Sequence, residues 1–291
     1  MARARRVIWA DAFTTQVFGG NPCAVVFDAD DVPVETRIAV TRETRLSECS
    51  FIVRSEIADF GARYYLASGE ILMAGHPTVA TAAALDRAGL LEGRDSFTLE
   101  VGAGVMPVEI DRSGPVPIYT MTQPAPRFGR RYSPEEIAPL VGLAPEDILG
   151  TPQSVATGNM FCITRLRDHA ALARACLDAP ALLEARKVTD FWEPFLFVTE
   201  GFTREGDTAA RLLLPPPEPP EDPFTGSATG SLASYLWSEG LIERSSFTAE
   251  QGHGMDRPGT AKVTVLGARD AIEGVRVGGP AAVLMDGEIF L

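Results

Sequence analysis

The chain has 291 residues, of which 45% are hydrophobic and 22% are charged, as expected for a globular protein with a substantial buried core. That length is enough for two domains that each bury a core. The net charge of −13 argues against nucleic acid or an anionic membrane surface as a partner. An anionic substrate would therefore need a local positive site.

The four cysteines are widely spaced and show no metal-ligand pattern: Cys23, Cys49, Cys162 and Cys176. No signal peptide and no apolar run of transmembrane length can be recognised, so we expect reduced thiols in a cytoplasmic protein. Gly102-Ala103-Gly104 lacks the rest of a dinucleotide-binding fingerprint. These patterns predict an activity without a metal or another cofactor.

The first part of the chain is predicted to form short strands and one buried helix. Strand patterns occur at 6–11, 23–27, 49–53, 63–67, 96–101, 105–110 and 118–121. Residues 34–43 have helical spacing. Residues 77–90 are rich in alanine and mostly apolar, which predicts a buried helix, and Pro77 suits its first turn.

The second part repeats this design after a predicted domain crossing at 123–126. Strands are expected at 153–156, 160–166, 195–199, 209–214, 247–251, 261–265, 274–277, 281–285 and 288–291. A second apolar helix covers 231–237. The proline-rich run 215–220 can be a stiff loop, an interdomain linker or a polyproline ligand. Many short strands with one buried helix per half favour α+β barrels over alternating βαβ units.

Both buried helices begin with similar small-residue stretches. Ala74-Gly75-His76-Pro77 precedes the first helix, and Thr225-Gly226-Ser227 precedes the second, shortly after Asp222. The first amides of a helix carry partial positive charge and suit a carboxylate. The alternative is ordinary helix capping by Asp222 or Thr225.

Several motifs occur in a characteristic order: Asp11-Ala12-Phe13, Gly20-Asn21-Pro22-Cys23-Ala24-Val25-Val26, Leu46-Ser47-Glu48, Ala74-Gly75-His76-Pro77, Glu221-Asp222 with Thr225-Gly226-Ser227-Ala228, and Gln251-Gly252 followed by Arg257-Pro258. The ordered set spans nearly the whole chain and resembles the PhzF family of phenazine-biosynthesis isomerase-like proteins. Each motif alone is weak. The resemblance also favours the stiff loop for 215–220.

The resemblance implies an α+β, diaminopimelate-epimerase-like fold. Two similar domains would each wrap a barrel-like sheet around a central helix, with the active site in the cleft between them. We expect one domain at 1–121, joined by the last strand at about 280–291, and the other at 122–279. The family also implies a homodimer.

The resemblance implies that Glu48 is the general acid/base. In sequence terms Glu48 precedes an apolar run, which would raise the pKa of its carboxyl toward working pH. The alternative is an ordinary strand-edge glutamate in solvent. At a helix N-terminus the neutral form of His76 is favoured, so it is expected to donate or relay a proton. Asp222 is the expected partner of His76 across the cleft, in a proton relay or in binding a substrate amine.

Substrate binding is expected at the two helix starts. Gly75, Gly226 and Ser227 would hold a substrate carboxylate through backbone amides and a hydroxyl, with Ser47 supporting them. The predicted pocket wall departs from the family pattern at Tyr65, Leu66, Ala67, Leu213 and Phe224. Retained acid–base residues together with a changed pocket wall predict the same chemistry on a different substrate.

The resemblance implies a cofactor-independent isomerase that moves a proton between carbons of a small unsaturated amino or carboxylic acid. The substrate would be trans-2,3-dihydro-3-hydroxyanthranilate or another secondary-metabolite precursor, such as a pyrroline carboxylate in an antibiotic pathway. One alternative is a non-catalytic member of the fold that binds a ligand or a protein. Another is an epimerase or racemase without a cysteine pair, since Ala74 and Thr225 stand where two-thiol enzymes carry their cysteines.

Overall fold

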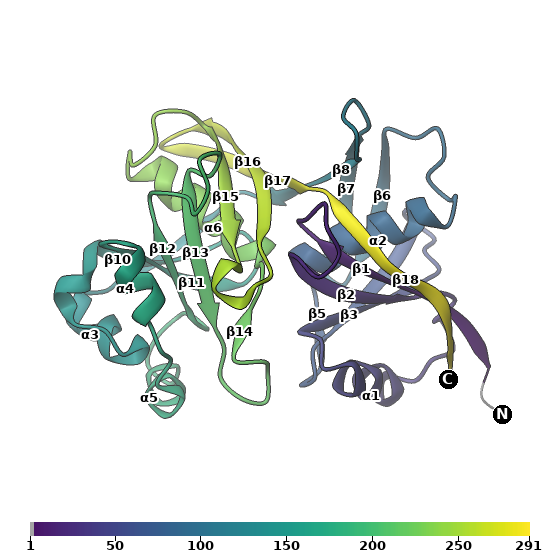
Figure 1. The fold of residues 1–291 in the computed structure, drawn as a ribbon, viewed down its shortest axis with the longest axis horizontal. Helices are drawn as coiled ribbons and strands as arrows, with labels where there is room; N and C mark the ends of the chain where they lie inside the picture. The colour runs from purple at the N-terminus through teal and green to yellow at the C-terminus, as the bar shows by residue number, and fades with distance from the viewer. Residues whose placement is uncertain (1–2) are drawn as a thin grey trace. The chain divides into compact units, whose positions relative to one another are not determined.

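The computed structural model describes residues 3–291, which form two compact units (Figure 1). The first unit comprises residues 3–122, 217–219 and 278–291. The second comprises residues 123–216 and 220–277. The C-terminal strand pairs with the N-terminal strand, so the end of the chain belongs to the first unit.

The elements of the first part of the chain are β1 (Ala4–Ala12), β2 (Asn21–Val26), α1 (Val34–Thr44), β3 (Glu48–Val53), β4 (Phe60–Tyr65), β5 (Glu70–Ile71), α2 (Gly75–Arg87), β6 (Ser96–Val101), β7 (Gly104–Asp111) and β8 (Ile118–Pro124). The remaining elements are β9 (Arg127–Arg131), α3 (Pro134–Ile137), η1 (Ala138–Val141), η2 (Pro145–Asp147), β10 (Ile148–Ala156), β11 (Met160–Leu166), α4 (His169–Arg174), α5 (Ala179–Ala185), β12 (Pro194–Val198), β13 (Thr208–Leu213), β14 (Glu221–Asp222), α6 (Gly226–Ser238), β15 (Ser246–Gln251), η3 (His253–Met255), β16 (Gly259–Ala268), β17 (Ala271–Gly279) and β18 (Ala281–Phe290).

The two units repeat one strand topology. In the first unit, β1 and β2 are antiparallel, β2 and β3 parallel, β3 and β4 antiparallel, β4 and β6 parallel, and β6 and β7 antiparallel. In the second unit, the pairs β10–β11, β11–β12, β12–β13, β13–β15 and β15–β16 alternate in the same way. Short strands β5 and β14 pair with β4 and β13, and each directly precedes the long helix of its unit. The same connectivity twice makes the units topological repeats.

Each unit is built around one buried helix. Helix α2 packs against β1, β2, β3 and β18, and α6 packs against β10, β11 and β16. Every residue from Gly75 to Leu85 is buried, and so is every residue from Gly226 to Leu236. Their small side chains allow close packing of the surrounding strands. Buried hydroxyls bond to the preceding turn, as Thr229 Oγ1 does to the Thr225 carbonyl at 2.9 Å.

The two buried helices match the sequence patterns that predicted them, with shifted ends. Helix α2 begins at Gly75 and ends at Arg87, and Gly89 follows in the left-handed region with φ +77°. The proline-rich run connects β13 to β14, which pair through Leu212 and Asp222. It is therefore a hairpin loop, as the stiff-loop interpretation expects. Strand β9 was not predicted, because Arg127–Arg131 has no apolar alternation.

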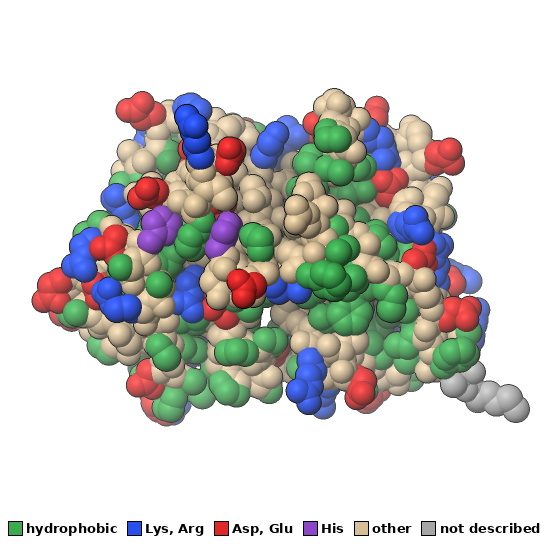
Figure 2. All heavy atoms as spheres, in the orientation of Figure 1, with side chains coloured by type: hydrophobic (Ala, Val, Ile, Leu, Met, Phe, Trp, Pro, Cys, Tyr) green, Lys and Arg blue, Asp and Glu red, His purple; other side chains and the backbone are tan. Residues whose placement is uncertain are grey.

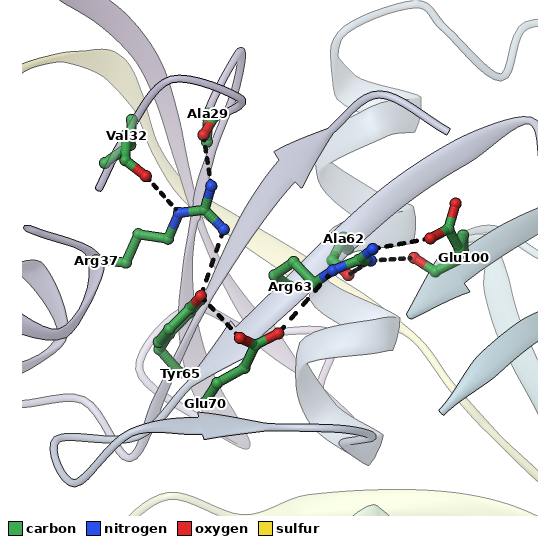
Figure 3. A network of polar contacts seen from close by, with 8 residues as sticks. All are labelled: Ala29, Val32, Arg37, Ala62, Arg63, Tyr65, Glu70 and Glu100. Atoms are coloured by element: carbon green, nitrogen blue, oxygen red, sulfur yellow. Dashed lines mark hydrogen bonds and ion pairs between the residues drawn. The ribbon is translucent and has the colours of Figure 1, made fainter. Parts of the chain in front are cut away.

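A buried arginine ties α1 to the sheet of the first unit (Figure 3). Arg37 donates to the carbonyls of Val32 (2.9 Å) and Ala29 (2.8 Å) and to the Tyr65 hydroxyl (3.4 Å). Tyr65 in turn donates to Glu70 Oε2 at 3.0 Å. These bonds satisfy polar groups that would otherwise be buried alone.

The same network continues from β4 to β6. Arg63 lies 4.0 Å from Glu70 and bonds Glu100 at 2.8 Å (Figure 3). Tyr65 is 1% exposed and its ring meets that of Phe51 edge-on, with centroids 5.5 Å apart. Tyr65 was assigned to the pocket wall from sequence. Its side chain instead belongs to the core, and its hydroxyl is engaged inside the unit.

Candidate active site

Glu48 is the first residue of β3, where the parallel strands β2 and β3 begin. Their register places Cys23 opposite Glu48, so the start of β2 lies beside the start of β3. The Glu48 side chain is only 17% exposed, and the next residues of the strand, including Phe51, are buried. The carboxyl therefore lies at the edge of the apolar core rather than in open solvent.

His76 is the second residue of α2 and is 3% exposed. Its Nδ1 lies 3.8 Å from Glu48 Oε2 and 2.9 Å from Asn21 Nδ2. Burial lowers the pKa of His76 to about 3, so the imidazole is neutral near pH 7. A neutral imidazole was predicted from its place at a helix N-terminus, whereas the cause in the structure is burial.

Ser47 completes this group, since its Oγ donates to Asn21 Oδ1 at 3.3 Å. The fold thus brings together four of the predicted residues of the first unit: Ser47, Glu48, Gly75 and His76. Asn21 joins them, although the sequence analysis did not include it among the site residues. Its only sequence signal is its place in the Gly20-Asn21-Pro22 motif of the family resemblance.

A second predicted group lies at the start of α6 in the second unit. Asp222 is buried in β14 and accepts a hydrogen bond from Thr225 Oγ1 at 2.6 Å. Gln251 holds both residues, because its Nε2 donates to the Asp222 carbonyl (2.7 Å) and its Oε1 accepts from the Thr225 amide (3.0 Å). Gln251 is a positioning residue that the sequence showed only as part of a motif.

Neither buried helix has a side-chain N-cap. The N-cap residues Ala74 and Thr225 make no capping hydrogen bond through their side chains. The capping alternative is therefore wrong for Thr225, whose hydroxyl donates to Asp222 instead. The N-cap side chains therefore do not bond the first-turn amides of either helix, and the positive end of each helix favours an anion there.

The first turn of α6, with Gly226 and Ser227, is fixed from outside the helix. Gln123 Nε2 donates to the Gly226 carbonyl at 2.9 Å, and Thr157 Oγ1 donates to the Ser227 carbonyl at 3.3 Å. Gly230 is required for this contact, because a Cβ at that position would lie 1.9 Å from Gln123 Oε1. The turn predicted to bind a carboxylate is thus rigid.

The thiols are poorly suited to acid–base chemistry. Cys23 and Cys49 are buried, and burial raises the pKa of both thiols. Cys49 adjoins Glu48 but also contacts Thr44 Oγ1 at 3.5 Å. A thiol held protonated is a weak base, which agrees with the argument against two-thiol epimerisation.

The other two histidines belong to the second unit, whose partly exposed histidine side chains appear in purple in Figure 2. Phe202 contacts both, with ring centroids 4.9 Å from His169 and 4.4 Å from His253. The loop carrying Phe202 is anchored by the buried Glu250, which accepts from the Phe202 amide at 2.6 Å. This cluster is explained by packing alone.

Among residues 3–291, no group of three or more His, Cys, Asp and Glu side chains is arranged to hold a metal ion. In the same part of the chain, no helix has both the length and the apolar character needed to cross a membrane.

Comparison with known proteins identifies relatives along the whole chain. Residues 10–287 match the family described as phenazine biosynthesis-like protein, PhzC-PhzF. The chain is 30% identical to the trans-2,3-dihydro-3-hydroxyanthranilate isomerase of Pseudomonas aeruginosa, over 98% of this chain and 99% of that protein. It is also 30% identical to the uncharacterized isomerase YfhB of Bacillus subtilis, over 88% and 89% of the two chains.

The fold is likewise shared with a solved structure. The phenazine biosynthesis protein of the PhzF family from Bacillus anthracis superposes with a TM-score of 0.89, at 26% identity, covering 99% of this chain and 100% of that one.

The repeated units, each with mixed strand pairing around one buried helix, and the named relatives define this chain as an isomerase with a diaminopimelate-epimerase-like fold. More specifically, the chain belongs to the PhzC-PhzF family of phenazine biosynthesis-like proteins. The fold class, the family and the enzyme class predicted from the motifs are confirmed, and the non-catalytic alternative falls away.

Proposed function

We propose that this isomerase moves a proton between carbon atoms of a small unsaturated amino or carboxylic acid, with Glu48 as the general acid/base. The observation that carries the proposal is the Glu48–His76 pair, with Oε2 and Nδ1 3.8 Å apart at the edge of the core. A carboxylate partly removed from water is a better carbon base than one in solvent.

The proposed reaction needs no oxidant or reductant. The Glu48 carboxylate removes a proton from one carbon, the double bonds shift, and the same carboxyl returns a proton to another carbon. A resulting enol then becomes a ketone. The neutral His76 serves as a hydrogen-bond donor or relay beside Glu48 rather than as a cation, in keeping with its lowered pKa.

Asp222, Gly226 and Ser227 are proposed to serve the same substrate. The α6 amides near Gly226 and the Ser227 hydroxyl would bind its carboxylate, together with the α2 amide at Gly75. Asp222 would bind a substrate amine or take part in the proton relay. The contacts of Gln251 and Gln123 support this role, because they hold this turn rigid.

The substrate proposed first is trans-2,3-dihydro-3-hydroxyanthranilate or a close analogue, because one relative bears that name at 30% identity over 98% of this chain. A pyrroline carboxylate of an antibiotic pathway is the second choice, given the departures at Leu66 and Ala67. We also propose a cytoplasmic homodimer, the commonest symmetric assembly. Light scattering that gives only the 31.2 kDa of one chain at micromolar concentration would contradict the dimer.

The test is deuterium incorporation from heavy water into both candidate substrates, followed by NMR, for wild type and Glu48→Gln. The amide keeps the shape of the side chain but cannot take up the proton, so turnover should fall by about 10²–10⁴-fold. Substrate binding and melting temperature should change little. Exchange at a single carbon without a shift of the double bond would identify an epimerase instead.

The matched control is Glu43→Gln, which makes the same substitution at an exposed position in the last turn of α1. It should leave exchange unchanged. If Glu48→Gln folds, binds substrate and exchanges deuterium at the wild-type rate, then Glu48 is not the base and the proposed mechanism is wrong.

A further inference from the structure

We propose that Asn21 is a positioning residue that fixes the tautomer of His76. The proton is then carried by Nε2, and this N–H group donates a hydrogen bond to an oxygen of the substrate. The tautomer part concerns the protein alone, whereas the donation to substrate rests on the proposed function.

The position of Asn21 is rigid. It is the first residue of β2, is 0% exposed, and pairs with Ala12 of β1. Gly20, just before it, has φ +48°, and a Cβ there would lie 2.0 Å from the Ala12 carbonyl oxygen. Only glycine allows this close turn, and Pro22 restricts the chain on the other side. The Asn21 amide therefore faces its partners in a set orientation.

The two ends of that amide have different partners. Ser47 Oγ donates to Oδ1 at 3.3 Å, while Nδ2 lies 2.9 Å from His76 Nδ1. An amide nitrogen can only donate, so Nδ1 must accept. A neutral imidazole has one acceptor and one donor nitrogen, which places the hydrogen of His76 on Nε2.

That Nε2–H is buried without a partner in the protein. His76 is 3% exposed, and among residues 3–291 no atom accepts a hydrogen bond from its Nε2. A buried donor without an acceptor is costly, and proteins rarely retain one. The chemistry that would satisfy it is an acceptor oxygen of a ligand, such as a carbonyl, hydroxyl or carboxylate of the substrate.

The contact between Asn21 Nδ2 and His76 Nδ1 also separates the roles of His76 and Glu48. Glu48 Oε2 is 3.8 Å from Nδ1, the nitrogen that Asn21 already occupies as donor. With the other tautomer, Nδ1–H could donate to the carboxylate and weaken it as a base. Asn21 thus leaves the Glu48 carboxylate to act as base and directs the histidine proton elsewhere.

The experiment is nitrogen-15 NMR of histidine-labelled protein, with His76→Gln to assign the signals. Wild type should show His76 protonated at Nε2 and not at Nδ1. In Asn21→Asp a carboxylate of the same shape replaces the amide, and it can only accept. The proton should then move to Nδ1, and His76 should titrate at higher pH than in wild type.

The matched control is Asn159→Asp, which changes the exposed asparagine between β10 and β11 and should keep the wild-type tautomer. With a substrate that wild type turns over, Asn21→Asp should lower kcat by about 10²-fold, the usual effect of losing one well-placed donor to the reacting group. KM should change less than kcat.

Two outcomes overturn the proposal. One is a wild-type His76 protonated at Nδ1, a measurement that needs no variant to fold. The other is Asn21→Asp with an unchanged tautomer or an unchanged kcat. Failure of the proposed function is recognised separately, because it is seen in Glu48→Gln exchange, whereas the tautomer is read in the absence of substrate.

Discussion

Burial lowers the pKa of His76 to about 3, and this shift makes the stability of the protein depend on pH. In the unfolded chain histidine titrates near pH 6.5, as a typical value. Between about pH 6.5 and 3 the unfolded chain binds a proton that the folded protein does not bind. The free energy of unfolding therefore falls as pH drops through this window, and the full stability is present only above it.

The size of the effect follows from the two pKa values. Each pKa unit corresponds to about 1.4 kcal/mol, so lowering the pH from 8 to 5 should cost about 2 kcal/mol through His76 alone. The assay is urea unfolding at both pH values for wild type and for His76→Gln, which has no titrating group at this position. The wild-type loss should exceed that of the variant by about 2 kcal/mol.

The control for this measurement is Asn159→Gln, which changes an exposed asparagine that does not titrate. It should retain the full wild-type dependence on pH. An equal loss of stability in wild type and His76→Gln would refute the reasoning, because it would mean that the buried imidazole accepts a proton in the folded protein as readily as in the unfolded chain.

Three further predictions concern the parts of the structure that hold the site. Gly230→Ala should displace Gln123 and cost about 2–3 kcal/mol in thermal unfolding, while Gly254→Ala, whose Cβ would meet nothing within 4 Å, should cost far less. Arg37→Met should cost about 2–4 kcal/mol in urea unfolding, because it removes a buried donor and leaves the buried Val32 carbonyl without its bond from Arg37, whereas Arg54→Met, with a side chain 93% exposed, should be nearly neutral. Turnover of the natural substrate should survive chelation and dialysis, and recovery of lost activity on adding a metal ion would contradict the proposed acid–base mechanism.

Much of the fold could be predicted because its signals are local. A helix made mostly of small and apolar residues is stabilised by burial in a core, so α2 and α6 were recognisable from their composition. Short strands between turn residues indicated barrels, and the ordered motifs indicated the family. The same motifs led to Glu48 and His76, and the fold brings Glu48 Oε2 to 3.8 Å from His76 Nδ1, a contact that was not predicted. Strand β9 was not predicted, because charged residues replace the alternation of apolar and polar residues that is expected of a strand.

The supporting residues could not be predicted, since their partners are distant in sequence. Asn21 meets His76 across 55 positions, Gln251 meets Thr225 across 26, and Gln123 meets Gly226 across 103. Tyr65 was assigned to a pocket wall, and only the packing of α1 against the sheet places it in the core. The sequence by itself determined the buried helices and the family, and it indicated the candidate site residues. The pairing of strands and the packing around those helices decided which asparagine and glutamine side chains hold the candidate site. Register and long-range contacts leave no periodic pattern along the chain, so they could not be predicted from it.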